Sequence, residues 1–259
     1  MLDIAQEGRP ARKIAYIASG AQKAGLPGLF WMSGFKSDMV STKASVIADW
    51  AEEWGAAYTR FDYSGHGASE GRIEDFTIGD WLLESETVFR EKTSGPQVVI
   101  GSSMGGWLAL LLARSLVRRG EADRLKALVL IAPAWDMTEE LMWKKFTPEA
   151  HAAMEKDGVY YEPSDYGEPY ALTRALIEEG RNHLLAGSSF DPGCPVRIVQ
   201  GMRDPDVPWR HAAALMDLLA NDDMRMTLIK DGEHRLSRDG DLAVLHGAIE
   251  EFIQRKEKE

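Results

Sequence analysis

The sequence predicts an α/β protein in which helices cover both faces of a mostly parallel central sheet. Runs of strand-forming residues alternate with helix-like runs along the 259 residues. Several of the central strand-like runs, such as residues 128–131, are apolar throughout, which is typical of strands buried on both faces. Because 44% of the residues are hydrophobic, a chain of this length can form one sizeable core.

The expected strands are short runs of apolar or alternating residues. Residues 224–228 alternate between apolar and polar side chains, so the last strand is expected at an edge of the sheet with one face in water. The expected strands comprise residues 14–18, 28–33, 57–62, 97–101, 127–132, 196–200 and 224–230.

Capping residues mark the expected helices between these strands. Ser41 is suited to begin a helix that ends before Gly55. Further helices are expected over residues 103–119, which Gly120 follows, and over residues 209–220. The helix near the C-terminus is predicted by an apolar stripe that consists of Leu242, Leu245, Ile249 and Phe252.

The segment of residues 135–190 interrupts the alternation, because it has no strong strand signal and is too long for a plain crossover loop. Thr147 and Pro148 predict the start of a helix that ends at Gly158, and residues 170–185 predict another. We therefore expect a helical cap over residues 135–190, inserted before the penultimate strand of a core formed by residues 1–134 and 191–259. Its aromatic residues either line a pocket or hold the cap together; they are Trp135, Trp143, Phe146, Tyr160, Tyr161, Tyr166 and Tyr170.

A Gly-x-Ser-x-Gly sequence, residues 101–105, lies between an apolar strand and a helix. This context is required for a nucleophile elbow, in which a tight turn lifts the serine, here Ser103, above the sheet. The alternative is an ordinary glycine-rich turn. In an elbow, the backbone N–H of Met104 at the helix start would face a developing oxyanion. The second donor is expected to be the N–H of Phe35, which follows Gly34 in the loop after an earlier strand.

A serine hydroxyl needs a base, usually a histidine, and the histidine needs a carboxylate that orients it. His234 follows the last expected strand and is the candidate base. Asp204 and Asp206 follow the preceding strand, at the edge where ligand chemistry occurs in parallel sheets. Asp204 is preferred, whereas Asp206 is suited to a turn or a helix cap. Asp136 is a third candidate, although its simpler role is the first polar residue of the cap.

The other histidines are poorer candidates. Those in expected helices are His151, His183, His211 and His246. His66 lies in a glycine-rich loop, residues 61–69, that lacks the lysine and the spacing of a phosphate-binding loop. We interpret that loop as a tight structural turn beside the site. No histidine pair has the spacing of metal ligands, so neither a metal nor a cofactor is expected.

Composition limits the partners. The formal net charge of −11 and the pI of about 5.1 disfavour nucleic acid and anionic membrane surfaces. No apolar run reaches the length of a membrane span. The single cysteine, Cys194, excludes an internal disulfide and is expected to be a buried packing residue. The partner expected is a small-molecule substrate.

These motifs together resemble an α/β-hydrolase-fold serine hydrolase, in which the chain order is serine, acid, histidine. Longer strings resemble one branch, that of mitochondrial palmitoyl-protein thioesterases and acyl-glucuronide esterases with their bacterial relatives. These strings are GFKSDM (34–39), GSSMGGWL (101–108), CPVR (194–197), GMRD (201–204) and DVPW (206–209). The resemblance covers nearly the whole chain from about residue 29 and is weakest in the cap. It implies that Ser103 is the nucleophile, Asp204 the orienting acid and His234 the general base.

The expected activity is the cleavage of carboxylic esters or acyl thioesters through an acyl-enzyme. The alternatives are C–C bond or amide cleavage on the same residues, or a ligand receptor on a hydrolase fold. The first residues lack the features of a secretory signal and of a transit leader, so a cytoplasmic location is expected. Apolar surface on the cap would suit a homodimer.

Overall fold

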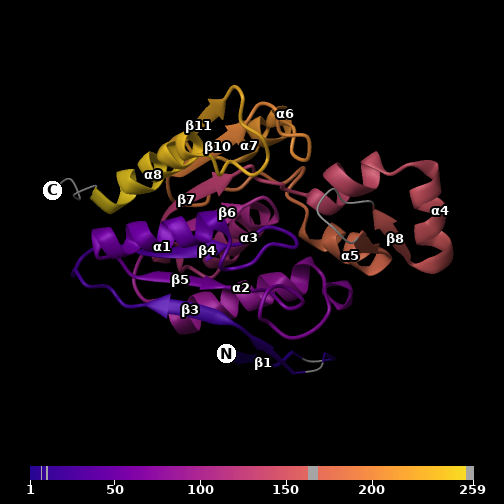
Figure 1. The fold of residues 1–259 in the computed structure, drawn as a ribbon, viewed down its shortest axis with the longest axis horizontal. Coiled ribbons are helices and arrows are strands. Elements are labelled where there is room, and N and C mark those ends of the chain that lie inside the picture. The colour runs from indigo at the N-terminus through magenta and orange to yellow at the C-terminus, as the bar shows by residue number, and fades with distance from the viewer. Residues whose placement is uncertain (7, 10, 163–168, 255–259) are drawn as a thin grey trace.

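The computed structural model describes residues 1–6, 8–9, 11–162 and 169–254, and its centre is a seven-stranded sheet (Figure 1). The strand order is β11-β10-β7-β6-β4-β5-β3, and every pair is parallel except β3 with β5. The predicted fold class is confirmed. The strands are β3 (Tyr16–Ser19), β4 (Gly28–Met32), β5 (Tyr58–Phe61), β6 (Gln97–Ser102), β7 (Leu125–Ile131), β10 (Val196–Gly201) and β11 (Met224–Ile229).

Helices cover both faces of this sheet (Figure 1). Leu29 and Trp31 of β4 point to one face, where they join a core with α1 (Thr42–Trp54) and α8 (Asp239–Gln254). The alternate residues of β4 point to the other face, where α2 and α3 complete a second core. The bounds of the latter helices are α2 (Ile78–Lys92) and α3 (Met104–Arg118).

The edge strand and the capped helices agree with the sequence prediction. β11 lies at one edge of the sheet and alternates between half-buried and exposed side chains. Helix α1 ends at Gly55, whose φ of 78° is the left-handed conformation that favours glycine. Ser41 occupies the N-cap position of α1, but its side chain makes no cap hydrogen bond.

Three elements of the core differ from the prediction. The expected strand over residues 14–18 is broken, because β2 (Arg12–Ile14) pairs with β1 (Leu2–Ile4) in a separate hairpin. Helix α2 was not predicted; it begins where the Asp80 carboxylate accepts hydrogen bonds from both the N–H and the hydroxyl of Thr77, each 2.9 Å long. The expected helix over residues 209–220 is divided into α6 (Trp209–Ala213) and α7 (Leu215–Leu218).

The cap segment lies beside the sheet and contains a hairpin as well as helices (Figure 1). α4 begins and ends as predicted, since the Thr147 hydroxyl accepts from Ala150 and Gly158 is left-handed. The predicted helix over residues 170–185 is wrong in its first turn, which is strand β9 paired with β8. Tyr166 lies outside the described residues. The cap elements are η3 (Met137–Met142), η4 (Trp143–Lys145), α4 (Pro148–Asp157), β8 (Val159–Glu162), β9 (Tyr170–Thr173), α5 (Arg174–Gly180) and η5 (Arg181–His183).

Asp136 joins the two ends of the cap segment. Its buried carboxylate accepts hydrogen bonds from the N–H groups of Leu185 and Ala186, at 2.7 and 2.9 Å. The Arg114 guanidinium adds a bond to the carbonyl of Leu184 at 3.3 Å. Asp136, the third candidate for the acid, is therefore occupied in closing the base of the cap.

Every helix within the described residues is too short or too polar to cross a lipid bilayer.

Candidate active site

Ser103 lies on a sharp turn between β6 and α3. Its φ of 56° and ψ of −119° are strained for a non-glycine residue, at a cost of roughly 1–3 kcal/mol. The flanking glycines make this turn possible, because a Cβ on Gly101 would collide with the carbonyl of Gly105, and one on Gly105 with the carbonyl of Met32. The strand–turn–helix context predicted for an elbow is therefore present.

The structure brings Ser103, His234 and Asp204 into one hydrogen-bonded chain. His234 Nε2 lies 3.1 Å from Ser103 Oγ, and His234 Nδ1 lies 2.8 Å from Asp204 Oδ2. In the neutral tautomer that fits these contacts, Nδ1–H donates to the carboxylate and Nε2 accepts from the hydroxyl. The three residues come from loops at the carboxyl ends of β6, β10 and β11.

The Asp204 carboxylate is held from several sides and is only 7% exposed. Its Oδ1 accepts the backbone N–H groups of Asp206 and Val207, at 2.9 and 2.8 Å. Its Oδ2 also accepts from the side-chain amide of Gln200 at 3.2 Å. These donors fix the orientation of the carboxylate and of the oxygen that faces His234.

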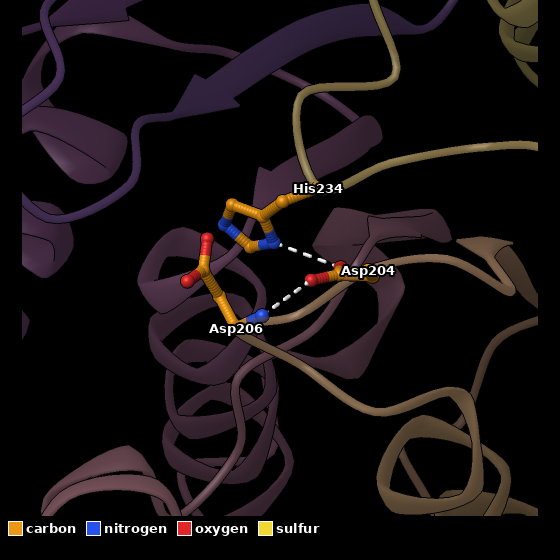
Figure 2. Close-up of side chains that lie close together, drawn as sticks. All are labelled: Asp204, Asp206 and His234. Carbon is orange, nitrogen blue, oxygen red and sulfur yellow. Dashed lines mark hydrogen bonds and ion pairs between the residues drawn. The ribbon is translucent and has the colours of Figure 1, made fainter. Parts of the chain in front are cut away.

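Asp206 is close to this pair but makes no comparable contact through its side chain. Its backbone N–H binds Asp204, while its exposed side chain points toward the His234 ring from the side away from that bond (Figure 2). Ligand-type atoms of the three residues lie within 4.8 Å of one another. Such a set could hold a divalent cation, but two of its members, Asp204 and His234, are already bonded to each other.

The two backbone groups expected to stabilise an oxyanion lie beside Ser103. Met104 is the first residue of α3, so its N–H has no acceptor within the helix. The loop that carries Phe35 approaches closely, because a Cβ on Gly34 would lie 3.2 Å from Ser103 Cβ. Both residues therefore lie in segments that adjoin Ser103.

A cavity of about 980 Å³ opens at Ser103. Part of its wall is apolar and comes from the cap residues Met137, Leu141, Met142 and Leu172, with Phe35 from the core. The charged residues of the wall are Lys36, Asp38, Lys43, Lys145, Glu162, Asp206 and Arg235.

Burial shifts the titration of two of these charged groups. Together with the smaller effect of the neighbouring Arg235, it lowers the pKa of Lys43 to about 8. The Lys43 amine donates a hydrogen bond to the carbonyl of Arg235, the residue after His234. Burial raises the pKa of Glu162, and the nearby charge of Asp206 adds to that shift. The substrate therefore meets a cavity that is only partly apolar.

Three aromatic residues of the cap hold it together. Trp143, Phe146 and Tyr160 pack around a small core of Met154, Leu172 and Ile177. None of the cap aromatics whose side chains the structure describes lines the cavity, so the first of their two possible roles does not apply to them. A subdomain this small needs its own core, and its large rings are used there.

The glycine-rich loop with His66 is a buried structural turn, as predicted. The imidazole is 3% exposed, and its Nδ1–H donates to the carbonyl of Ser64 at 3.1 Å. Its Nε2 is buried without a hydrogen-bond partner. Burial lowers the pKa of His66 to about 4, so the ring is neutral near pH 7.

His66 is therefore expected to make the fold acid-sensitive. The unfolded chain takes up this proton near pH 6.5 but the folded chain only near pH 4, so stability is lost as the pH falls between these values. The loss is about 3 kcal/mol in total. Urea unfolding of wild type and His66→Phe would be measured from pH 7 to pH 4. The difference between their free energies of unfolding should change by about this amount over that range. Parallel pH curves for the two proteins would contradict the assignment.

Comparisons with known proteins agree with this fold. A model of the alpha/beta hydrolase family matches residues 24–249. The mitochondrial palmitoyl-protein thioesterase ABHD10 of Bos taurus is 33% identical over 233 residues, which is 88% of this chain and 74% of the relative. The solved structure of a protein from Agrobacterium vitis S4 is 41% identical with a TM-score of 0.93, covering 98% of this chain and 97% of that one. Mouse ABHD10 is 29% identical with a TM-score of 0.83 and 97% coverage of both chains.

The same comparisons correct one expectation. The sequence predicted a cytoplasmic location, whereas the curated relatives from cattle, human and mouse are all named as mitochondrial.

Proposed function

The chain belongs to the alpha/beta hydrolase family, and we propose that it is a serine hydrolase of carboxylic esters or acyl thioesters. One observation carries the proposal: Ser103, His234 and Asp204 form a continuous hydrogen-bonded chain at the wall of a cavity. The relatives named as thioesterases support a substrate with an activated acyl group.

The proposed reaction has two steps. His234 Nε2 removes the proton from Ser103 Oγ, which attacks the acyl carbon, and the imidazolium is stabilised by Asp204. The N–H groups of Phe35 and Met104 hold the oxyanion. His234 then protonates the alcohol or thiol as it leaves. In the second step, His234 activates water, which releases the acid from the acyl-enzyme.

The cavity wall suggests which part of a substrate lies where. The apolar residues from the cap suit an acyl chain, whereas charged residues of the core loops suit a polar leaving group. The palmitoyl group in the relatives' name belongs to those proteins, and the cap that would select chain length is where the resemblance is weakest. We propose small to medium acyl groups as the substrates.

A series of 4-nitrophenyl esters from acetyl to palmitoyl tests the proposal, with Ser103→Ala as the blank. We expect kcat/KM to rise with chain length while each added CH₂ is buried, at about 0.8 kcal/mol per group, and to stop rising where the chain leaves the cavity. Matched thioesters of the best chain length then compare the two leaving atoms. Equal rates for wild type and Ser103→Ala across both series would contradict the proposed function.

A further inference from the structure

We propose that the loop of residues 62–69, here the positioning loop, holds the loop of residues 33–39, here the oxyanion loop, in its working conformation. Two contacts join the loops. The Asp62 carboxylate accepts a hydrogen bond from the N–H of Met39, and the His66 ring packs against the Phe35 ring. The inference rests on the proposed function, because it concerns the loop that would present the Phe35 N–H to an oxyanion. It assigns Asp62 and His66 as positioning residues.

The oxyanion loop needs an external support. Lys36, next to Phe35, has a φ of 55°, a left-handed conformation that a lysine rarely adopts. Such strain persists only where neighbouring structure fixes it. Within the loop, Ser37 N–H donates to the Gly34 carbonyl at 3.1 Å, and Ser33 Oγ donates to the Asp38 carbonyl at 3.2 Å.

Asp62 provides a charged support at one end of the oxyanion loop. Its side chain is 2% exposed, and Oδ1 accepts the N–H of Met39 at 2.6 Å. Oδ2 accepts the N–H of Ala68 at 2.8 Å, within the positioning loop itself. One carboxylate therefore joins the two loops, and bonds to an ionised acceptor are stronger than those between neutral groups.

His66 provides an aromatic support at the other end. Its ring lies edge-on to Phe35, with centroids 6.1 Å apart and an interplanar angle of 71°. Trp81 contacts both rings, at 5.2 Å from His66 and 5.9 Å from Phe35. The carbonyl of Ser64 accepts from both His66 Nδ1 and Trp81 Nε1, each at 3.1 Å, which fixes the two rings that hold Phe35.

Loss of either support is expected to lower kcat and to leave KM nearly unchanged, because the oxyanion exists only in the transition state. Removal of one oxyanion donor lowers the rate by about 10²–10³-fold. A donor that is only displaced should lower the rate by no more than this. For His66→Ala we expect a fall in kcat of about 10–100-fold on a 4-nitrophenyl ester. His66→Phe retains an aromatic edge against Phe35 and should stay within about threefold of wild type.

The experiment compares three variants, His66→Ala, His66→Phe and Asp62→Asn, with the control His246→Ala. His246 lies on α8, and its imidazole packs on Trp50 and Trp54 of α1. Besides kcat and KM, it measures the inhibition constant of an arylboronic acid, whose tetrahedral adduct places an oxygen in the oxyanion site. The inhibition constant should rise with the fall in kcat/KM for His66→Ala and Asp62→Asn, and stay unchanged for His66→Phe and His246→Ala. Thermal unfolding verifies that each variant is folded. If Asp62→Asn is not folded, the kinetics of His66→Ala test the inference.

Wild-type kcat and boronate affinity in a folded His66→Ala would overturn the inference, as would an equal loss in His66→Phe or an effect on KM alone. Failure of the proposed function gives a different result. In that case the wild type itself shows no hydrolysis that depends on Ser103, and both ideas fall together.

Discussion

Ser103→Ala is expected to lower kcat for the best 4-nitrophenyl ester by about 10⁴-fold or more. The reason is the geometry around one oxygen: Ser103 Oγ is the atom that His234 Nε2 contacts at 3.1 Å, and it lies at the start of helix α3. Alanine removes that oxygen and leaves the turn in place. The residual rate should be the part contributed by binding and by the backbone donors alone.

Ser102 offers a matched control for this prediction. It is the last residue of β6, lines the same cavity and also carries a hydroxyl, but the structure gives it no contact with His234. Ser102→Ala should keep activity within about tenfold of wild type, since it is a small change at a buried site. Circular dichroism and thermal unfolding should show both variants folded. Substantial turnover by folded Ser103→Ala would defeat the assignment of the nucleophile.

Asp204→Asn and Asp206→Asn are expected to differ by a factor of about 10³ in kcat/KM. An amide at position 204 presents an N–H group where His234 Nδ1–H needs an acceptor, which favours the wrong tautomer of the base. The two backbone N–H groups that Oδ1 accepts can still bind the amide oxygen of asparagine, so the loss falls on the bond to His234. We expect a loss of about 10³–10⁴-fold for Asp204→Asn.

The change at position 206 should have a much smaller effect. The contribution of Asp206 to this network is its backbone N–H, which asparagine retains, and its side chain is exposed. A loss of no more than about threefold is expected, in line with the weak effect of an exposed charge. Steady-state kinetics of both variants at pH 7.5 measures the contrast. The reverse pattern would move the orienting acid to Asp206.

Much of the candidate site could be predicted from the sequence because its signals are local. Gly101 is required by a close backbone contact with Gly105 within the same turn, so the pentapeptide itself carries much of the information. Asp204 and His234 lie in the loops after β10 and β11, and parallel strands bring their carboxyl ends to one edge. The choice of Asp204 over Asp206 agrees with the contacts, although its catalytic role stays a proposal.

The parts that the sequence did not predict depend on distant partners. Residues 170–173 form a strand only because β8 pairs with them, and a short apolar run by itself does not distinguish strand from helix. Asp136 finds its hydrogen-bond donors at residues 185 and 186, across the whole cap segment. The cap aromatics were ambiguous for the same reason, since packing against Met154 and Leu172 is visible only once the cap is folded.

The role of Ser103 as a nucleophile activated by His234 can be tested by locating a covalent adduct. The protein would be treated with an alkyl fluorophosphonate, digested and examined by mass spectrometry, alongside Ser103→Ala and His234→Ala. We predict a single adduct on the peptide that contains Ser103, absent from Ser103→Ala and formed far more slowly in His234→Ala. An adduct on a different residue, or one that forms equally fast without His234, would contradict the account.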